Sequence, residues 1–227
     1  GFFAIWFGLI GYMPDMEDLQ NPISRYASQI YSDEGKIIGT WNINRENRIM
    51  VEYNELSPDL VHALVSTEDE RFYEHSGIDF IALGRAVIKR GLFRQASAGG
   101  GSTITQQLAK QLYSEAAHNS VERLIQKPIE WVIAIKLERN FTKEEIIAMY
   151  LNYFDFLHSA VGIKRAANTY FNKEPNKLSL AESATLIGLC KNPSYFNPVR
   201  HPERCKERRD VVLGQMLKTA YITRSQY

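Results

Sequence analysis

Cysteine is scarce in this chain of 227 residues, and the two that occur, Cys190 and Cys205, lack the spacing of metal ligands. No pair of histidines stands near them. A disulfide between the two is one interpretation and a pair of buried or idle thiols is the other, and we expect the thiols. The cysteine content therefore leaves the cellular compartment undecided.

An excess of charge of either sign is also absent. Lys and Arg together number 27 and Asp and Glu 26, which gives a formal net charge of +1. Bulk electrostatics therefore do not steer the protein to nucleic acid, and we predict no nucleic-acid partner. A composition of 44% hydrophobic and 23% charged residues fits an ordinary globular domain and excludes a disordered chain, a collagen and a repeat array.

The first apolar stretch, residues 1–12, has no charge but is shorter than the about 20 residues that a membrane-spanning helix needs. Trp6 and Tyr12 suit a membrane interface, and Pro14 closes the run. We interpret residues 1–13 as the end of a transmembrane anchor. A buried core helix and the remnant of a signal peptide are the alternatives.

Residues 14–56 are predicted to form a β-rich linker. Runs rich in β-branched and aromatic residues flank Asp33-Glu34-Gly35, which is a hairpin turn signal. A further short strand is expected over residues 48–53.

Residues 57–227 have helical patterns without βαβ alternation, so a Rossmann-like fold is not expected. Ser57-Pro58 reads as an N-cap followed by proline at the first helical position. Thr142 to Glu145 and Ser179 to Glu182 both fit the capping box, and the second of these helices should end before Asn192-Pro193. Further helices are predicted at 80–93, 104–113, 121–139 and 202–218.

Glu68 is the first candidate for catalysis. Val61, Val65 and Phe72 share its helical face, so the carboxylate interrupts an apolar stripe. Desolvation there would raise its pKa toward neutrality, as a general base requires. Taken alone, an acidic residue on such a stripe is usually a boundary residue. The neighbouring Asp69 points elsewhere and is expected to make a structural hydrogen bond.

The segment 98–110, AGGGSTITQQLAK, runs from glycines into a predicted helix. Such a loop leaves backbone N–H groups free to meet an anion, and Gln106, Gln107 and Lys110 add further donors. No Gly-Lys-Ser/Thr follows the glycines, so this is not a Walker motif, and a diphosphate outside a nucleotide fits better. A flexible connecting loop is the alternative.

A basic and acidic cluster follows. Arg123, Lys127 and Glu130 lie four and three residues apart on one helical face, where a surface ion pair is the simpler explanation. Pro128 implies a helix start or a kink. Earlier, residues 80–95 mix apolar and basic residues in a way that suits a helix on an anionic membrane surface, with an amphipathic core helix as the alternative.

His75 has no second histidine at ligand spacing, so we expect it to make a structural hydrogen bond and predict no metal ligand among the site residues.

In their order, these segments resemble the conserved motifs of the peptidoglycan glycosyltransferases, glycosyltransferase family 51, over residues 55–218. Residues 68–77, EDERFYEHSG, are similar to the first motif, ED-x-x-F-x-x-H-x-G, and 101–110, GSTITQQLAK, to the second. The remaining similarities are at 127–130 for the third motif, 143–152 and 162–171 for the fourth and its neighbour, and 192–198 with the Arg-rich helix after it for the last.

Two positions depart from the family pattern. Gln126 stands where the third motif usually has Arg, which puts that side chain's contribution to phosphate binding in doubt. Leu157 and His158 follow Phe156 where the family commonly has Gly, which would reshape one wall of the cleft.

The resemblance implies a mainly α, lysozyme-like fold with two lobes, one of them a smaller membrane-facing jaw. It also implies polymerisation of lipid II into glycan strands with inversion at the sugar C1 and release of polyprenyl diphosphate. Glu68 would take the proton from the acceptor 4-hydroxyl. Glu130, the second catalytic residue, would orient cations or a metal or assist the leaving group. The substrate-binding residues implied are Asp69, Ser102, Thr103, Gln106, Gln107, Lys110, Arg123 and Lys127.

By the same resemblance no cofactor is obligatory, although a divalent Mg or Mn ion has a place at the diphosphate. The expected partners are lipid II, the growing lipid-linked glycan strand, the membrane and other cell-wall synthesis proteins. The expected location is the bacterial inner (cytoplasmic) membrane, with the catalytic domain on the periplasmic or outer face. The sequence contains no Ser-x-x-Lys, yet the β linker and the continuing C-terminus favour a bifunctional class A penicillin-binding protein over a monofunctional enzyme.

Two other functions compete with this one. A lysozyme-like lytic transglycosylase or hydrolase would act on existing glycan with one Glu as general acid, but it has no need for the anion-binding segment that ends at Lys110. A non-catalytic membrane-tethered scaffold would have been marked by loss of Glu68 or Lys110, and both are present.

Overall fold

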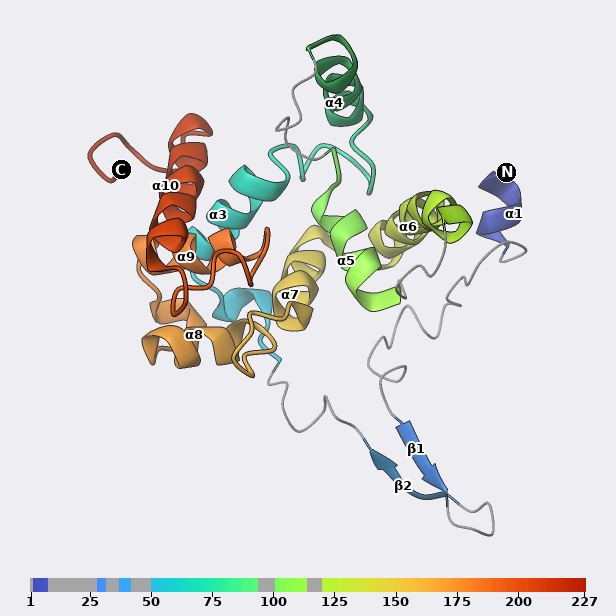
Figure 1. Cartoon of the computed structure of the whole chain (residues 1–227), viewed down its shortest axis with the longest axis horizontal. Coiled ribbons are helices and arrows are strands. Elements are labelled where there is room, and N and C mark those ends of the chain that lie inside the picture. The colour runs from blue at the N-terminus through green and yellow to red at the C-terminus, as the bar shows by residue number, and fades with distance from the viewer. Residues whose placement is uncertain (1, 8–27, 32–36, 42–49, 94–100, 114–119) are drawn as a thin grey trace.

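The computed structural model describes residues 2–7, 28–31, 37–41, 50–93, 101–113 and 120–227. Apart from one two-stranded sheet, the regular structure in these residues is helical (Figure 1), so the chain is mainly α as predicted. The elements are α1 (Phe2–Trp6), β1 (Ser28–Tyr31), β2 (Ile37–Trp41), η2 (Tyr53–Glu55), α3 (Pro58–Glu68), α4 (Phe80–Phe93), α5 (Ile104–Tyr113), α6 (Ser120–Asn140), α7 (Lys143–Tyr153), α8 (Ile163–Phe171), η3 (Pro175–Lys177), α9 (Leu180–Leu189) and α10 (Pro202–Lys218).

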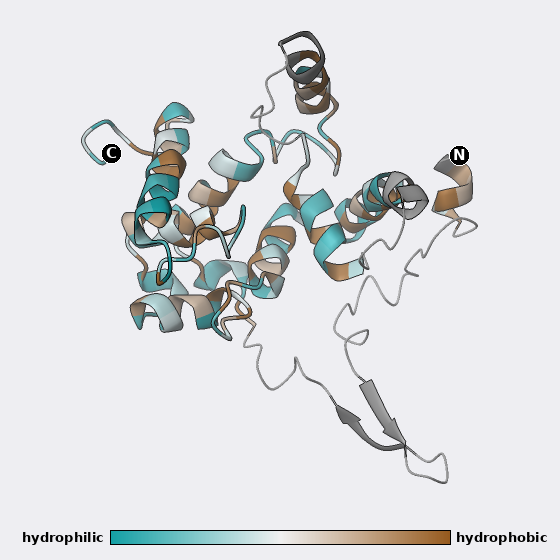
Figure 2. Ribbon diagram, in the orientation of Figure 1, coloured by the Kyte–Doolittle hydropathy of each residue, from teal (hydrophilic) through white to brown (hydrophobic). Residues whose placement is uncertain are grey.

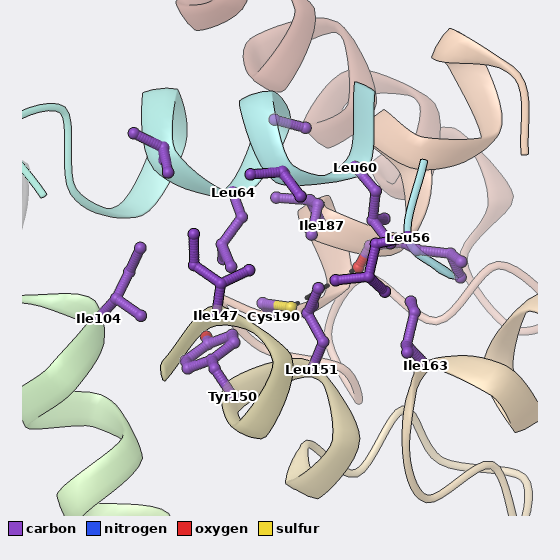
Figure 3. Close-up of a cluster of buried hydrophobic side chains, with 14 of the residues drawn as sticks. Leu56, Leu60, Leu64, Ile104, Ile147, Tyr150, Leu151, Ile163, Ile187 and Cys190 are labelled. Carbon is purple, nitrogen blue, oxygen red and sulfur yellow. Dashed lines mark hydrogen bonds between the residues drawn. The ribbon is translucent and has the colours of Figure 1, made fainter. Parts of the chain in front are cut away.

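The core lies where α3, α7 and α9 meet, and α10 covers α3 and α9 (Figures 1 and 3). Leu60 and Leu64 of α3, Ile147 of α7 and Ile187 of α9 are completely buried. Burial of each such side chain contributes about 1.5–3 kcal/mol. This packing fixes the end of α3, where Glu68 lies.

The helix starts follow the local sequence closely. Both predicted capping boxes are present: the Thr142 and Ser179 side chains accept from the backbone of Glu145 and Glu182, whose carboxylates bond back. Proline stands at the first position of α3, but the Ser57 hydroxyl makes no capping hydrogen bond. Helices α4, α5 and α10 have the predicted bounds.

Three details differ from the prediction. Helix α3 ends at Glu68, so Phe72 does not continue its stripe. Asp69 leaves the helical conformation with φ −158° and ψ 76°, and Phe72 is buried in the turns that follow. Helix α6 continues through Pro128, which is therefore not a helix start. Residues 50–52 are not a strand, because the side-chain amide of Asn152 bonds both the N–H and the C=O of Val51.

Strands β1 and β2 pair antiparallel from Ser28 opposite Trp41, with an irregularity between Ile30 and Tyr31. The predicted turn at Asp33-Glu34-Gly35 lies outside the described residues.

The first helix packs against α6. Ile5 is buried, and Trp6 lies below the cationic groups of Lys136 and Arg139, 5.3 and 5.0 Å from its ring. Burial lowers the pKa of Lys136. Within the part of the chain that the structure describes, no helix is both long enough and apolar enough to span a bilayer. The assignment of residues 1–13 to an anchor stays a prediction.

Helix α4 stands away from the main body (Figure 1), and its described residues are mainly hydrophobic (Figure 2). Phe80, Ile81, Val87 and Ile88 are between 53% and 70% exposed. The alternative of an amphipathic core helix is therefore wrong for these residues.

Residues 155–161 form a tight loop closed by a bridge between Asp155 and Val161. Leu157, His158 and Ser159 have φ angles of 65°, 51° and 62°, a left-handed conformation that costs a side-chain-bearing residue about 1–2 kcal/mol. The position where the family has Gly is thus one where glycine would be unstrained.

Candidate active site

Glu68 occupies the last position of α3, and its side chain is 15% exposed. The side-chain Nε2 of Gln107 donates to one carboxylate oxygen at 3.2 Å, and Nη2 of Arg208 lies 3.5 Å from the other. A carboxylate that acts as a base must be ionised, and the guanidinium supplies its counter-charge. Glu68 is therefore held from two sides while it remains accessible.

Arg208 reaches this site from α10 by crossing α9. Its Nε donates to the carbonyl of Gly188 at 3.4 Å, and a Cβ at position 188 would lie 3.0 Å from the Arg208 side chain. Phe196 lies on another side, with its ring 5.8 Å from the guanidinium carbon. Sequence analysis did not single out Arg208: the Arg-rich helix was noted, but no spacing indicates which arginine meets a residue 140 positions earlier.

Tyr150 of α7 lies in the segment 143–152 that resembles the fourth motif, but it was not among the predicted site residues. Its hydroxyl donates to Oε1 of Gln107 at 3.1 Å, so Gln107 joins Tyr150 to Glu68. Tyr150 is completely buried, beside Cys190 in the core (Figure 3). Burial, with smaller effects of Cys190 and Glu68, raises the pKa of Tyr150 well above its ordinary value.

Asp69 makes the structural hydrogen bonds that its position predicted. One carboxylate oxygen accepts from the backbone N–H of Ile104 at 3.0 Å and pairs with Nε2 of His75 at 2.9 Å. The other ring nitrogen of His75 accepts from the N–H of Gly77, so the prediction of a structural role for His75 is confirmed. With a side chain only 4% exposed, Asp69 fastens the end of α3 to the start of α5.

The start of α5 is a further capping box. The backbone N–H of Thr103 donates to the side chain of Gln106, whose own N–H donates to the Thr103 hydroxyl. That hydroxyl also donates to the carbonyl of Gly77. The backbone N–H groups of Thr103, Ile104 and Gln106 therefore donate to protein oxygens. The prediction that these groups are free to bind an anion is wrong. The sequence did contain the signal for this capping box, which is the Thr-x-x-Gln spacing of residues 103–106.

Lys127 and Glu130 meet on α6, with Nζ of the lysine 2.6 Å from a carboxylate oxygen. The lysine side chain is 55% exposed, whereas Glu130 is 1% exposed, so the ammonium group lies at the surface and the carboxylate beneath it. Gln126 is half-buried on the same helix. Arg123 lies in α6, but its side chain is outside the described residues.

Lys110 follows Gln107 by three residues on α5, so it shares the helical face that looks toward Glu68, and its side chain is exposed. Ser102 precedes the helix and is half-buried. These two residues remain available to a ligand, in contrast to the buried Thr103 and Gln106.

A second polar network supports the loop after α3. Nζ of Lys143 donates to the carbonyl of His75 at 2.7 Å and to Glu138 at 2.9 Å, and the Thr105 hydroxyl donates to the same Glu138 oxygen. The Lys143 ammonium also lies 4.3 Å from the ring centre of Phe72. The residues that follow Glu68 are thus bound to α5, α6 and α7.

Cys190 and Cys205 are free and buried, as expected, and burial raises the pKa of both thiols. Across the described ranges, no group of three or more His, Cys, Asp or Glu side chains is arranged to hold a metal ion.

Comparison with known proteins places these residues in a family. A family model described as Transglycosylase matches residues 34–217. Penicillin-binding protein 1F of Bacillus subtilis (strain 168) is 40% identical over 206 residues, which is 91% of this chain and 28% of the relative. Penicillin-binding protein 1A of Escherichia coli (strain K12) is 39% identical over 226 residues, which is 97% of this chain and 26% of the relative.

A crystal structure of penicillin-binding protein 1A from Haemophilus influenzae aligns with a TM-score of 0.47 and 27% identity over 88% of this chain and 19% of that chain. The chain spans about a quarter of the length of the curated relatives that it matches. Because the family model covers most of the chain, the chain belongs to the transglycosylase family, the family 51 glycosyltransferase domains of class A penicillin-binding proteins.

Proposed function

We propose that the domain is a peptidoglycan glycosyltransferase that polymerises lipid II into glycan strands, with Glu68 as the general base. The observation that supports this most directly is the Glu68 carboxylate, which is accessible, is held by Gln107 and Arg208, and lies in the segment that resembles the first motif of the family. The chain's membership in the transglycosylase family supports the substrate class.

In the proposed step the 4-hydroxyl of the acceptor sugar attacks C1 of the donor. The new O4–C1 bond forms as the bond from C1 to the diphosphate oxygen breaks, and the configuration at C1 inverts. The hydroxyl proton passes to Glu68, and the electron pair of the broken bond leaves with polyprenyl diphosphate. A positioned base contributes roughly 10²–10⁴-fold, so alignment and charge neutralisation supply the rest.

The leaving diphosphate would be neutralised by the exposed ammonium groups of Lys110 and Lys127, with Ser102 and Arg123 as further contacts. Glu130 would hold Lys127 in place from below. Asp69, Thr103 and Gln106 would then assist binding indirectly, because they form the start of α5. A Mg²⁺ or Mn²⁺ ion would bind mainly through the diphosphate oxygens, because the Glu130 carboxylate is buried and paired with Lys127, and no step above depends on such an ion.

The exposed apolar residues of α4 support a location at the membrane surface, where the lipid-linked substrate resides. We infer a lysozyme-like arrangement in which α4 belongs to the membrane-facing jaw. The parent protein would be anchored in the bacterial inner membrane, with this domain on its outer face and other cell-wall synthesis proteins as partners.

The test compares wild-type protein with Glu68→Gln on labelled lipid II, with the products separated by size. Wild type should produce long strands, and the variant should lose at least roughly 10²-fold in rate. Glu70→Gln is the matched control, because Glu70 is 48% exposed and forms a surface ion pair with Lys218. Surface ion pairs contribute little, so the rate of this variant should stay within about twofold of the wild-type rate. Intact lipid II together with cleavage of added glycan would instead indicate a lytic enzyme.

A further inference from the structure

We infer that Tyr150 is a positioning residue for the transfer reaction: its buried hydroxyl holds the carbonyl end of the Gln107 side-chain amide and thereby keeps the N–H end in place against Glu68. This inference rests on the proposed function, because it concerns the base of that reaction. Tyr150 acts through Gln107 and is not itself in contact with Glu68 in the bonds described above.

The geometry is a chain of two hydrogen bonds. The Tyr150 hydroxyl donates to Oε1 of Gln107 at 3.1 Å, and Nε2 of Gln107 donates to Oε2 of Glu68 at 3.2 Å. An amide has an acceptor at one end and donors at the other, so a contact that selects its oxygen also selects where its N–H groups point. A carboxylate that acts as a base can only accept, so Glu68 selects the N–H end of the amide, and the Tyr150 hydroxyl fixes the amide by donating to its other end.

The surroundings of Tyr150 make it a dependable donor. Its pKa is raised well above the ordinary value, first by burial, so the hydroxyl stays protonated at neutral pH. The neighbouring Cys190 thiol is a weak acceptor, and its own S–H points to the carbonyl of Leu186 at 3.8 Å. If the Gln107 amide turned over, its oxygen would face the oxygen of Glu68, and the Tyr150 hydroxyl would exchange its amide acceptor for the weak acceptor at Cys190.

The other carboxylate oxygen is held separately by Arg208, which comes from a different helix. The two contacts fix both oxygens and therefore the plane of the carboxylate. Arg208 alone fixes one oxygen and leaves the group free to swing, so the orientation of Gln107 decides where the basic lone pair points.

Removal of the hydroxyl by Tyr150→Phe keeps the ring and its packing. We expect kcat to fall roughly tenfold, because a misaligned base loses part of its advantage. A carboxylate that loses an N–H donor is protonated more easily, so the acidic limb of the pH profile of kcat/KM should also move to higher pH. A role limited to packing would not move that limb.

The experiment is a double-mutant cycle on lipid II polymerisation, measured from pH 5 to 9 with wild type, Tyr150→Phe, Gln107→Met and the double variant. If Tyr150 acts through Gln107, Tyr150→Phe should have almost no further effect once Gln107 is Met. Tyr170→Phe is the matched control: its hydroxyl donates to the carbonyl of Phe156 at 2.6 Å, so its effect should add independently to Gln107→Met.

The outcomes distinguish a failure of the proposed function from a failure of the positioning role of Tyr150. Absence of glycan strands from wild type would refute the proposed function itself. Polymerisation by wild type, with an unmoved acidic limb in Tyr150→Phe or with additive effects in the cycle, would refute only the positioning role. Should Tyr150→Phe fail to fold, Gln107→Met alone must move the acidic limb to higher pH; if that limb stays in place, the inference is wrong.

Discussion

Ser159 is exposed and is one of three consecutive residues with a left-handed backbone, so its conformation can be tested with little change in packing. Ser159→Gly should stabilise the domain by about 0.5–1 kcal/mol, because glycine adopts this conformation without steric cost. Chemical denaturation measures the change. Ser159→Ala keeps the Cβ and should give no gain; equal stability of both variants would contradict the strain.

Single residues were predicted well where one local rule decides. His75 and Asp69 were expected to make structural hydrogen bonds, and they bond each other. The partners of Glu68 were not predictable in this way, because Gln107 and Arg208 come from other helices and no periodicity links them to position 68. The left-handed loop at 157–159 was not predicted either, although the glycine that the family commonly has at this point was a signal of a positive φ.

At the scale of one helix, the start of α9 should make stability depend on pH. Burial tends to raise the pKa of Glu182, but hydrogen bonds from Lys173 and Ser179 and the lysine charge outweigh it, so the pKa is lowered below its ordinary value of 4.5. A carboxyl group with a depressed pKa stabilises the fold above that ordinary value, and the contribution is lost as the pH falls through the depressed one.

Glu182→Gln should therefore lower the free energy of unfolding at pH 7 by a few tenths to about 1 kcal/mol, and the loss should be smaller at pH 3, below the ordinary pKa. The Lys173→Met variant, which removes the partner, should show the same pattern. Urea denaturation at both pH values measures it. A loss of equal size at pH 3 and pH 7 would show that the capping geometry, and not the charge, is responsible.

The starts of the helices could largely be predicted from the sequence, because capping residues and prolines mark them. Helices α7 and α9 begin at the predicted boxes, and α10 begins at Pro202. The end of α3 was missed, because Asp69 leaves the helix for partners at His75 and Ile104 that are fixed only in the folded chain. Tertiary contacts decided that boundary, and local propensity did not.

For the molecule as a whole, the exposed face of α4 predicts binding to anionic lipid vesicles. Ile81→Ser, Val87→Ser and Ile88→Ser combined should reduce co-sedimentation with vesicles at least tenfold, because three apolar side chains at about 1.5–3 kcal/mol each would no longer be buried in lipid. Val199→Ser with Val211→Ser is the control, since these exposed valines lie beside and on α10. Unchanged binding of the α4 variant would place the membrane contact elsewhere.

The mainly helical architecture followed from the absence of βαβ alternation together with the capped apolar runs. The way in which α3, α5, α7 and α10 converge on Glu68 did not follow from them. That convergence depends on packing between segments far apart in the chain, such as α9 against α3 and α10.

The start of α5 has one more consequence. Its N–H groups at Thr103, Ile104 and Gln106 are already bonded to protein oxygens. Under the proposed function, the departing diphosphate would be bound mainly by lysine side chains. These are flexible and act as point charges, unlike a fixed set of backbone N–H groups. Such ion pairs break without any backbone rearrangement, so the polyprenyl diphosphate product would dissociate quickly. Product release would then not limit the rate of successive additions.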